Sequence, residues 1–281
     1  MFTVLEIIKK TTDFLAAKGV ESPRLNAELL IGHALGRKRM QLYMEFERPL
    51  SEVELEKIRP LVRRRALREP LQYIVGDTEF CGLRLLVDRR ALIPRPETEL
   101  LVEHVQRCRA SSLPGRILDL GTGSGAIALA LAAAFPAATV VAVDRSAEGL
   151  ELARRNAALT GLEARVTLLE SDWFEAVPVE AFDVVVSNPP YLTEDETDQT
   201  APEVRDFEPR SALAAADEGT ADLVRIIAQA PRYLAPGGLL ALETGIAQHA
   251  RLLPLLRSAG FGQVDSHPDL TGRERYLLAV K

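Results

Sequence analysis

The carboxyl-terminal two thirds of the chain alternate short apolar runs with longer helical patterns. Seven runs are typical of strands, at 116–120, 139–144, 165–172, 182–187, 238–243, 263–267 and 275–281. Helical segments lie between them, at 125–134, 146–160, 220–234 and 248–259. Strands that alternate with helices form a mostly parallel sheet covered on both faces. The sequence therefore predicts an α/β fold, in which a ligand binds beyond the carboxyl ends of the strands.

The first 75 residues carry helical patterns only. Apolar spacing predicts helices at 4–19, 22–36 and 51–70. Ser22 precedes a proline and is the expected cap of the second helix. Ser51 and Glu54 have the spacing of a capping box, and Pro60 is expected to bend or interrupt the third helix.

A short hairpin pattern separates the two parts of the chain. Residues 76–90 predict two strands that turn at Cys81–Gly82. We therefore expect an N-terminal helical domain at 1–75, a hairpin linker at 76–90 and a larger domain at 91–281.

The composition is that of an ordinary soluble globular protein, with 47% hydrophobic and 26% charged residues. No apolar run approaches the roughly 20 residues of a membrane-spanning helix, and the first residues lack the order of a secretion signal. Two cysteines are too few for a disulfide framework, and we expect both to be buried thiols. The four histidines share no metal-ligand spacing. We expect a cytoplasmic monomer with no metal ion and no membrane partner.

The charge is unevenly divided along the chain. Residues 1–85 hold 15 basic and 12 acidic side chains, whereas residues 86–281 hold 19 basic and 28 acidic ones. An acidic domain is a poor electrostatic match for a long phosphate backbone. This balance argues against DNA as a partner of the larger domain.

A glycine-rich turn follows the first strand of the larger domain, in the run Gly121-Thr122-Gly123-Ser124-Gly125. Glycines there let the backbone approach a ligand closely and turn into a helix. The spacing also fits a dinucleotide-binding fingerprint, with an acid about 20 residues further on. Asp119 favours a different ligand, because a carboxylate beside the turn repels a pyrophosphate but suits an amino group or a sulfonium.

The next two strand ends carry groups that suit an adenosine. Asp144 can accept both ribose hydroxyls, although it can also cap the following helix. Asp172 can accept the adenine amino group, and Trp173 can cover the ring. An adenosine with a charged, amine-bearing tail describes S-adenosylmethionine better than a nicotinamide dinucleotide.

The fourth strand ends in the motif Asn188-Pro189-Pro190-Tyr191. Prolines cannot extend a central strand, so the motif forms a stiff loop at the strand tip. The Asn188 side-chain oxygen and the Pro189 carbonyl can accept the two N–H groups of a planar NH₂ nitrogen. Such a nitrogen needs alignment with a sulfonium methyl rather than deprotonation, and alignment supplies up to roughly 7–11 kcal/mol. Tyr191 can pack against the flat substrate group.

Together these motifs resemble the class I methyltransferases that act on planar nitrogen, which have a Rossmann-like fold. The runs "LREPLQYIVGDTEFCGLRLLVD", "LIPRPETELLVE", "VRDFEPRSALAAADEG" and "DLTGRERYLLAV" resemble, more narrowly, the peptide chain release factor glutamine methyltransferase family. The resemblance implies methylation of the glutamine in the Gly-Gly-Gln loop of class 1 release factors. It implies a helical N-terminal domain that docks the substrate. It also implies that Asn188–Tyr191 hold the glutamine, while the cofactor is bound by Gly121, Thr122, Gly123, Ser124, Gly125, Asp144, Asp172, Trp173 and Asn188.

Three other functions share part of this pattern. An adenine-N6 DNA methyltransferase presents its base to the same kind of motif, but it needs a sizeable basic recognition region. A nicotinamide-dependent oxidoreductase leaves Asn188–Tyr191 unexplained, and a non-catalytic binding protein leaves no role for Asn188.

We expect Arg95 and Glu97 to brace the mouth of the pocket, and residues 192–219 to form a lid-like connection.

Overall fold

The computed structural model describes residues 2–281 and divides into two compact units. The first unit holds the described residues up to Asp77 together with Ala201–Phe207. The second holds Thr78–Thr200 and Glu208–Lys281.

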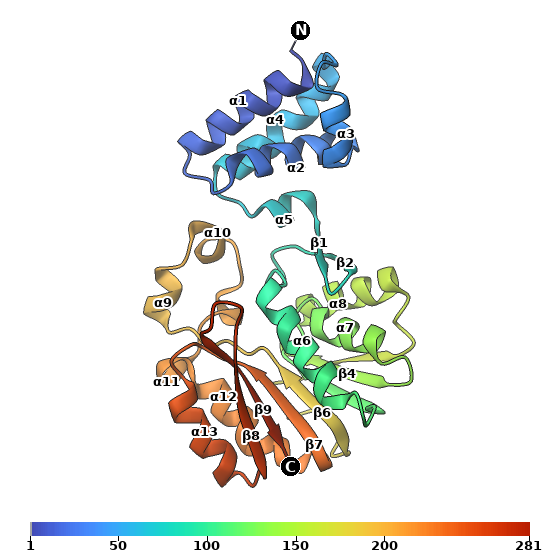
Figure 1. Ribbon diagram of the computed structural model, residues 1–281, viewed down its shortest axis with the longest axis vertical. Coiled ribbons are helices and arrows are strands. Elements are labelled where there is room, and N and C mark those ends of the chain that lie inside the picture. Colours follow the sequence, from blue (N-terminus) through green and yellow to red (C-terminus); the bar gives the residue numbers. More distant parts are fainter. Residues whose placement is uncertain (1) are drawn as a thin grey trace. The chain divides into compact units, whose positions relative to one another are not determined.

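The first unit is helical (Figure 1), as the sequence predicts. Its core is formed by buried aliphatic side chains such as Ile8, Leu30 and Ile58. Its helices are α1 (Val4–Ala17), α2 (Pro23–Leu35), α3 (Arg39–Met44), α4 (Glu52–Ala66), α5 (Leu71–Val75) and α10 (Pro202–Arg205).

The helix termini test the sequence predictions locally. Ser51 and Glu54 form the predicted capping box at the start of α4, with N···O distances of 3.3 and 2.9 Å. Ser22 stands at the N-cap position of α2, but it has a left-handed φ of 46° and its hydroxyl caps nothing. The α4 helix continues through Pro60 to Ala66, so the proline does not interrupt it.

Helix α10 comes from the long connection of the larger domain, yet it belongs to the first unit. Glu203 accepts hydrogen bonds from Arg65 Nη2 at 2.7 Å and from Arg68 Nη2 at 2.6 Å. Arg65 is 5% exposed, so this ion pair is largely buried. The expected boundaries 1–75 and 91–281 contain no sign of this excursion, because no local pattern links residues so far apart.

The predicted hairpin is formed by β1 (Asp77–Phe80) and β2 (Leu83–Leu86), which turn at Cys81–Gly82. Both turn residues have positive φ angles, 48° and 75°. Both cysteines, expected to be buried thiols, are free and exposed.

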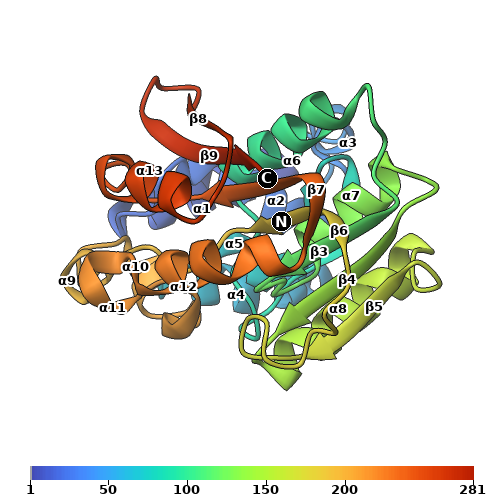
Figure 2. The same cartoon turned by 90° about the horizontal axis from the view of Figure 1, so that it is seen from below.

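The second unit is built on a seven-stranded sheet with the order β5-β4-β3-β6-β7-β9-β8. Neighbours from β5 to β7 are parallel, whereas β9 is antiparallel to both of its neighbours. Figure 2 shows β5, β4, β3, β6 and β7 side by side. The strands are β3 (Arg116–Leu120), β4 (Thr139–Asp144), β5 (Val166–Glu170), β6 (Phe182–Ser187), β7 (Leu234–Glu243), β8 (Gln263–Pro268) and β9 (Glu274–Val280).

Helices cover both faces of the sheet, which explains why its central strands β3, β6 and β7 are almost fully buried at their carboxyl ends. Val184 of β6 points to a core shared with α6 (Pro96–Arg109), α7 (Ala126–Ala134) and α8 (Ala147–Thr160). Its neighbour Val185 points to the opposite core, shared with α12 (Ala221–Gln229) and α13 (His249–Ser258). The predicted mostly parallel, Rossmann-like sheet with a helical N-terminal part and a hairpin is confirmed.

Candidate active site

The strand order reverses between β3 and β6, and a cavity of about 320 Å³ lies at the carboxyl ends of these strands. Its size and place are those of a ligand pocket in an open α/β sheet. The predicted site residues that line it are Gly121, Thr122, Gly123, Ser124, Asp144, Asp172, Trp173, Asn188 and Pro190. The predicted residues Gly125, Pro189 and Tyr191 do not line it.

The glycine turn has a steric reason for its composition. Gly121 has a φ of +73°, and a Cβ there would stand 3.2 Å from Cζ3 of Trp173. Gly125 has a φ of +84°, and a Cβ there would stand 3.2 Å from the Cβ of Ala153 in α8. Gly121 therefore keeps the turn close to the pocket, whereas Gly125 lets α7 begin tightly against α8.

Asp119 does not line the pocket, contrary to the electrostatic argument made from its sequence position. Its Oδ2 atom accepts from Thr122 Oγ1 at 2.6 Å and from the Ala128 backbone N–H at 3.1 Å. Its Oδ1 atom is buried and has no hydrogen-bond partner among the described residues. Burial raises the pKa of Asp119 to about 7. The carboxyl group therefore braces the turn from behind.

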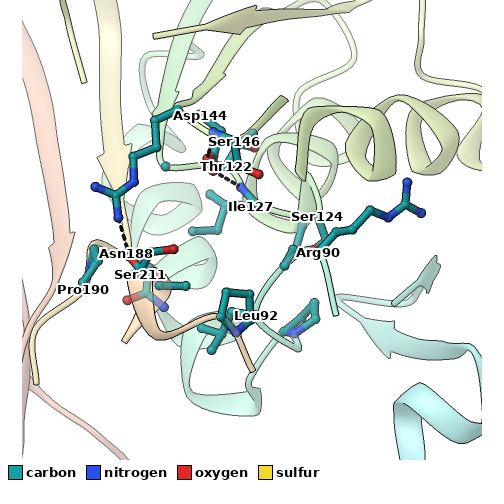
Figure 3. Close-up of a pocket in the computed structure, with 18 of the residues that line it drawn as sticks. Arg90, Leu92, Thr122, Ser124, Ile127, Asp144, Ser146, Asn188, Pro190 and Ser211 are labelled. Atoms are coloured by element: carbon teal, nitrogen blue, oxygen red, sulfur yellow. Dashed lines mark hydrogen bonds between the residues drawn. The ribbon is translucent and has the colours of Figure 1, made fainter. Parts of the chain in front are cut away.

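Asp144, at the end of β4, is joined to the turn by its side chain. Its Oδ2 atom accepts from Gly123 N–H at 2.8 Å, and its Oδ1 atom accepts from Ser146 N–H at 2.8 Å. Each carboxylate oxygen has a further lone pair available to a ligand hydroxyl. Figure 3 shows Asp144 among the residues that line the cavity.

Asp172 and Trp173 follow β5 and are held by α12. Asp172 Oδ2 accepts from Arg225 Nη2 at 3.0 Å, so this carboxylate already has a cationic partner. Trp173 Nε1 donates to Asp222 Oδ1 at 3.0 Å, which fixes the indole ring beside the glycine turn. Trp173 also has a left-handed φ of 52°, a conformation that bulky residues adopt rarely.

Asn188 begins the loop after β6, and its side-chain Nδ2 donates to Thr98 Oγ1 at 3.0 Å. Pro190 lies beside it on the cavity wall (Figure 3). Tyr191 instead turns to the tip of β7, where its hydroxyl donates to Glu243 Oε1 at 3.2 Å. The guanidinium of Arg275 stands 5.3 Å from the centroid of the Tyr191 ring.

The connection 192–219 contains short helices rather than an open loop. Pro209, Ser211 and Ala212 from it line the cavity. Arg145 Nη2 donates to the Ser211 carbonyl at 3.1 Å and ties this segment to the end of β4. The helices of this connection in the second unit are α9 (Glu194–Asp198), η1 (Arg210–Ala212) and α11 (Ala216–Gly219).

The segment before α6 forms part of the cavity wall. Arg95 lines the cavity, and its Nη2 donates to Glu208 Oε2 at 2.6 Å. Glu97 does not line the cavity, and its neighbour Thr98 does. The sequence analysis did not identify Thr98 or Glu243 as site residues. Glu243 ends a predicted strand, as Asp144 does, so the search for polar residues at strand ends could have identified it.

The cavity fits an adenosine with a cationic tail better than a pyrophosphate. Two backbone N–H groups near the start of α7, those of Gly123 and Ala128, already donate to the carboxylates of Asp144 and Asp119. A phosphate needs such donors free. The glycine turn, the free acceptor capacity of Asp144 and the adjacent indole ring match the parts of S-adenosylmethionine.

Within residues 2–281, no cluster of His, Cys, Asp and Glu has the geometry to hold a metal ion. In the same range, no helix is long and apolar enough to cross a membrane.

Comparison with known proteins places the chain in a family. Residues 6–76 match the model of the PrmC N-terminal domain, and residues 96–204 match that of the methyltransferase small domain. The release factor glutamine methyltransferase of Geobacter sulfurreducens is 44% identical over 99% of this chain and 96% of its own length. That of Chlorobaculum tepidum is 44% identical over 100% of this chain and 98% of its own length.

A solved structure shows the same fold. The Thermus thermophilus 16S rRNA N2 G1207 methyltransferase, in complex with AdoMet and guanosine, superposes with a TM-score of 0.53. It is 25% identical and covers 73% of this chain and 49% of its own. Fold, motifs and full-length relatives agree: the chain belongs to the release factor glutamine methyltransferase family.

Proposed function

We propose that this protein transfers a methyl group from S-adenosylmethionine to the side-chain amide nitrogen of a glutamine. The substrate is the Gly-Gly-Gln motif of class 1 peptide chain release factors. Full-length relatives named for this activity support the proposal. The observation that carries it is the Asn188 amide, which lies on the cavity wall with its NH₂ group bound to Thr98.

The cofactor supplies a methyl carbon bonded to a positively charged sulfur. On the protein side, the turn Gly121–Gly125 leaves space for its tail, and Asp144 is placed to accept the ribose hydroxyls. Trp173 is placed to cover the adenine. Asp172 is committed to Arg225, so its role at the adenine amino group is shared with that ion pair.

Asn188 and Pro189 would align the glutamine. Because Asn188 Nδ2 is bound to Thr98, its Oδ1 atom is left to accept one N–H of the substrate. Pro189 does not itself line the cavity, but it lies between Asn188 and Pro190, which do, and its carbonyl would accept the other N–H. As the nitrogen gains positive charge during transfer, these two oxygens stabilise it, and the methylated nitrogen then loses its extra proton to water. Tyr191 is anchored to Glu243 and would support this loop more than it contacts the glutamine.

The first unit would dock the release factor, in keeping with its match to the PrmC N-terminal domain. We propose a monomer that acts in the cytoplasm, where translation ends. The acidic balance of residues 86–281 supports a protein substrate over DNA. The full-length relatives likewise do not favour an adenine-N6 DNA methyltransferase.

Mass spectrometry tests the proposal directly. A purified class 1 release factor is incubated with the protein and S-adenosylmethionine, and its peptides are then fragmented. We expect one added methyl group, a gain equal in mass to one CH₂, on the glutamine of the Gly-Gly-Gln motif. A release factor with alanine in place of that glutamine is the control. Absence of the gain, or its location on another residue, would contradict the proposal.

A further inference from the structure

A buried carboxylate stands beside the amide of Asn188. Glu243 ends β7, and the register of β6 with β7 pairs Ser187 with Leu242, so Asn188 and Glu243 are neighbours at the sheet edge. Glu243 is 1% exposed. Burying a carboxylate is costly unless its oxygens accept hydrogen bonds, so its partners define what it does.

Two hydroxyl groups converge on this carboxylate from different elements. Thr98 Oγ1, from the first turn of α6, donates to Glu243 Oε2 at 2.8 Å. Tyr191 donates to Glu243 Oε1 at 3.2 Å. Asn188 Nδ2 in turn donates to Thr98 Oγ1 at 3.0 Å. The result is a continuous chain of hydrogen bonds from the buried carboxylate to the wall of the cavity.

The donors in this chain have a fixed direction. An ionised carboxylate only accepts hydrogen bonds, so the single hydroxyl hydrogen of Thr98 is committed to Glu243. The oxygen of Thr98 can then only accept, and the Asn188 amide must offer it the NH₂ group. The amide oxygen of Asn188 consequently faces away from Thr98.

We propose that Glu243, acting through Thr98, sets which end of the Asn188 amide is presented to the substrate. Thr98 and Glu243 are then positioning residues for methyl transfer, an inference that rests on the proposed function. In the opposite orientation, the NH₂ group of Asn188 would meet the NH₂ group of the glutamine, and neither could accept. This chain of hydrogen bonds therefore excludes the Asn188 rotamer in which the NH₂ group faces the substrate.

The surroundings of Glu243 make this arrangement dependent on pH. Burial raises the pKa of Glu243, while Thr98, Arg275 and Tyr191 oppose the rise and Glu97 adds to it. Tyr276 of β9 also interacts with this charge. A protonated Glu243 can donate to Thr98, which frees the threonine hydrogen to bond the Asn188 oxygen. We therefore expect kcat to fall as the pH drops through the raised pKa of Glu243.

Variants of nearly equal shape test the inference. Glu243→Gln and Thr98→Val keep the volume but remove the fixed direction of donation. We expect each to lower kcat about 10- to 100-fold, by analogy with the loss of groups that orient the ligands of a catalytic metal. The dissociation constant of S-adenosylmethionine and the melting temperature should stay near those of the unaltered protein. Thr98→Ser restores the hydroxyl and should restore kcat.

Three comparisons complete the experiment. The double variant T98V/E243Q should lose little more than either single variant, because both act through one chain. Glu103→Gln, at an exposed position of the same helix α6, is the matched control and should keep full kcat. The acid limb of the kcat profile should be present in the unaltered protein and in Glu103→Gln, and lost in Glu243→Gln.

A readout without turnover separates this inference from the proposed function. The side-chain NH₂ signals of Asn188 in ¹⁵N NMR spectra should exchange slowly with water, and faster in Thr98→Val. An unaltered protein that fails to methylate release factors would overturn the function, and these signals would still report the amide. The inference is wrong if both single variants keep kcat within twofold, or if kcat falls only together with cofactor binding and melting temperature.

Discussion

The two sides of the cavity are built in different ways. The glycine edge, formed by Gly121–Gly125 and Asp144, is held by bonds from Asp144 to residues 21 and 2 positions away. The amide edge, formed by Thr98, Asn188, Tyr191 and Glu243, is held by side chains 90, 145 and 52 positions apart. The edge assigned to the cofactor is thus a local motif, whereas the edge assigned to the substrate depends on the whole fold.

This difference predicts distinct responses to substitution. Changes at the glycine edge should act mainly on the affinity for S-adenosylmethionine. Changes at the amide edge should act mainly on kcat, with the cofactor still bound.

The largest effect is expected at the amide edge. Asn188→Ala removes an oxygen assigned to the glutamine, and kcat should fall by about 10²–10³-fold or more, as when one preorganised polar group is lost. Radioactive methyl transfer to a release factor measures kcat, and calorimetry measures cofactor binding. Near-normal turnover in this variant would remove Asn188 from the mechanism, and with it the distinction between the edges.

The next effect is expected at the glycine edge. Asp144→Ala should weaken the binding of S-adenosylmethionine by about 1.5–3 kcal/mol, because charged hydrogen bonds to the ribose are lost. Titration calorimetry gives the dissociation constant, with exposed Glu151→Ala as the control. At saturating cofactor, kcat should be largely kept. An unchanged dissociation constant would show that Asp144 only braces the turn.

A pair of glycine substitutions separates backbone strain from ligand contact. Gly121 and Gly161 have similar φ values of +73° and +69°, so alanine at either should cost about 1–2 kcal/mol of stability. Nothing lies within 4 Å of a Cβ at Gly161, whereas one at Gly121 meets Trp173. Only Gly121→Ala should therefore also weaken cofactor binding. Equal loss of affinity in both variants would mean that strain alone is responsible.

A separate effect, on stability rather than on turnover or cofactor affinity, concerns pH and the turn itself. Burial raises the pKa of Asp119 to about 7, from a usual value of about 3.9. Between these values the folded protein binds more protons than the unfolded chain, so the free energy of unfolding should fall as the pH rises. Urea unfolding of Asp119→Asn should lack this part of the decline. A decline of equal size in the variant would contradict the assignment.

Much of the glycine edge could be predicted from the sequence because its parts are close together. The turn, the strand end at Asp144 and the helix that follows form one continuous pattern. Asp119 shows the limit of that reading: its position beside the turn is local, but the direction of its side chain depends on burial.

The amide edge could be predicted only in part. The motif Asn188–Tyr191 can be recognised in the sequence, because two prolines follow a predicted strand. Its partners Thr98 and Glu243 lie in segments that only the folded sheet brings together. Glu203 likewise cannot be predicted as the partner of Arg65 and Arg68, because only the folded structure brings these distant residues together.

A crystal structure of the protein with S-adenosylhomocysteine and a release factor peptide that contains Gly-Gly-Gln would show the amide contacts themselves. We expect Asn188 Oδ1 and the Pro189 carbonyl both to accept from the glutamine NH₂ group, with Asn188 Nδ2 still bound to Thr98. A complex in which the Asn188 amide points away from the glutamine would contradict it.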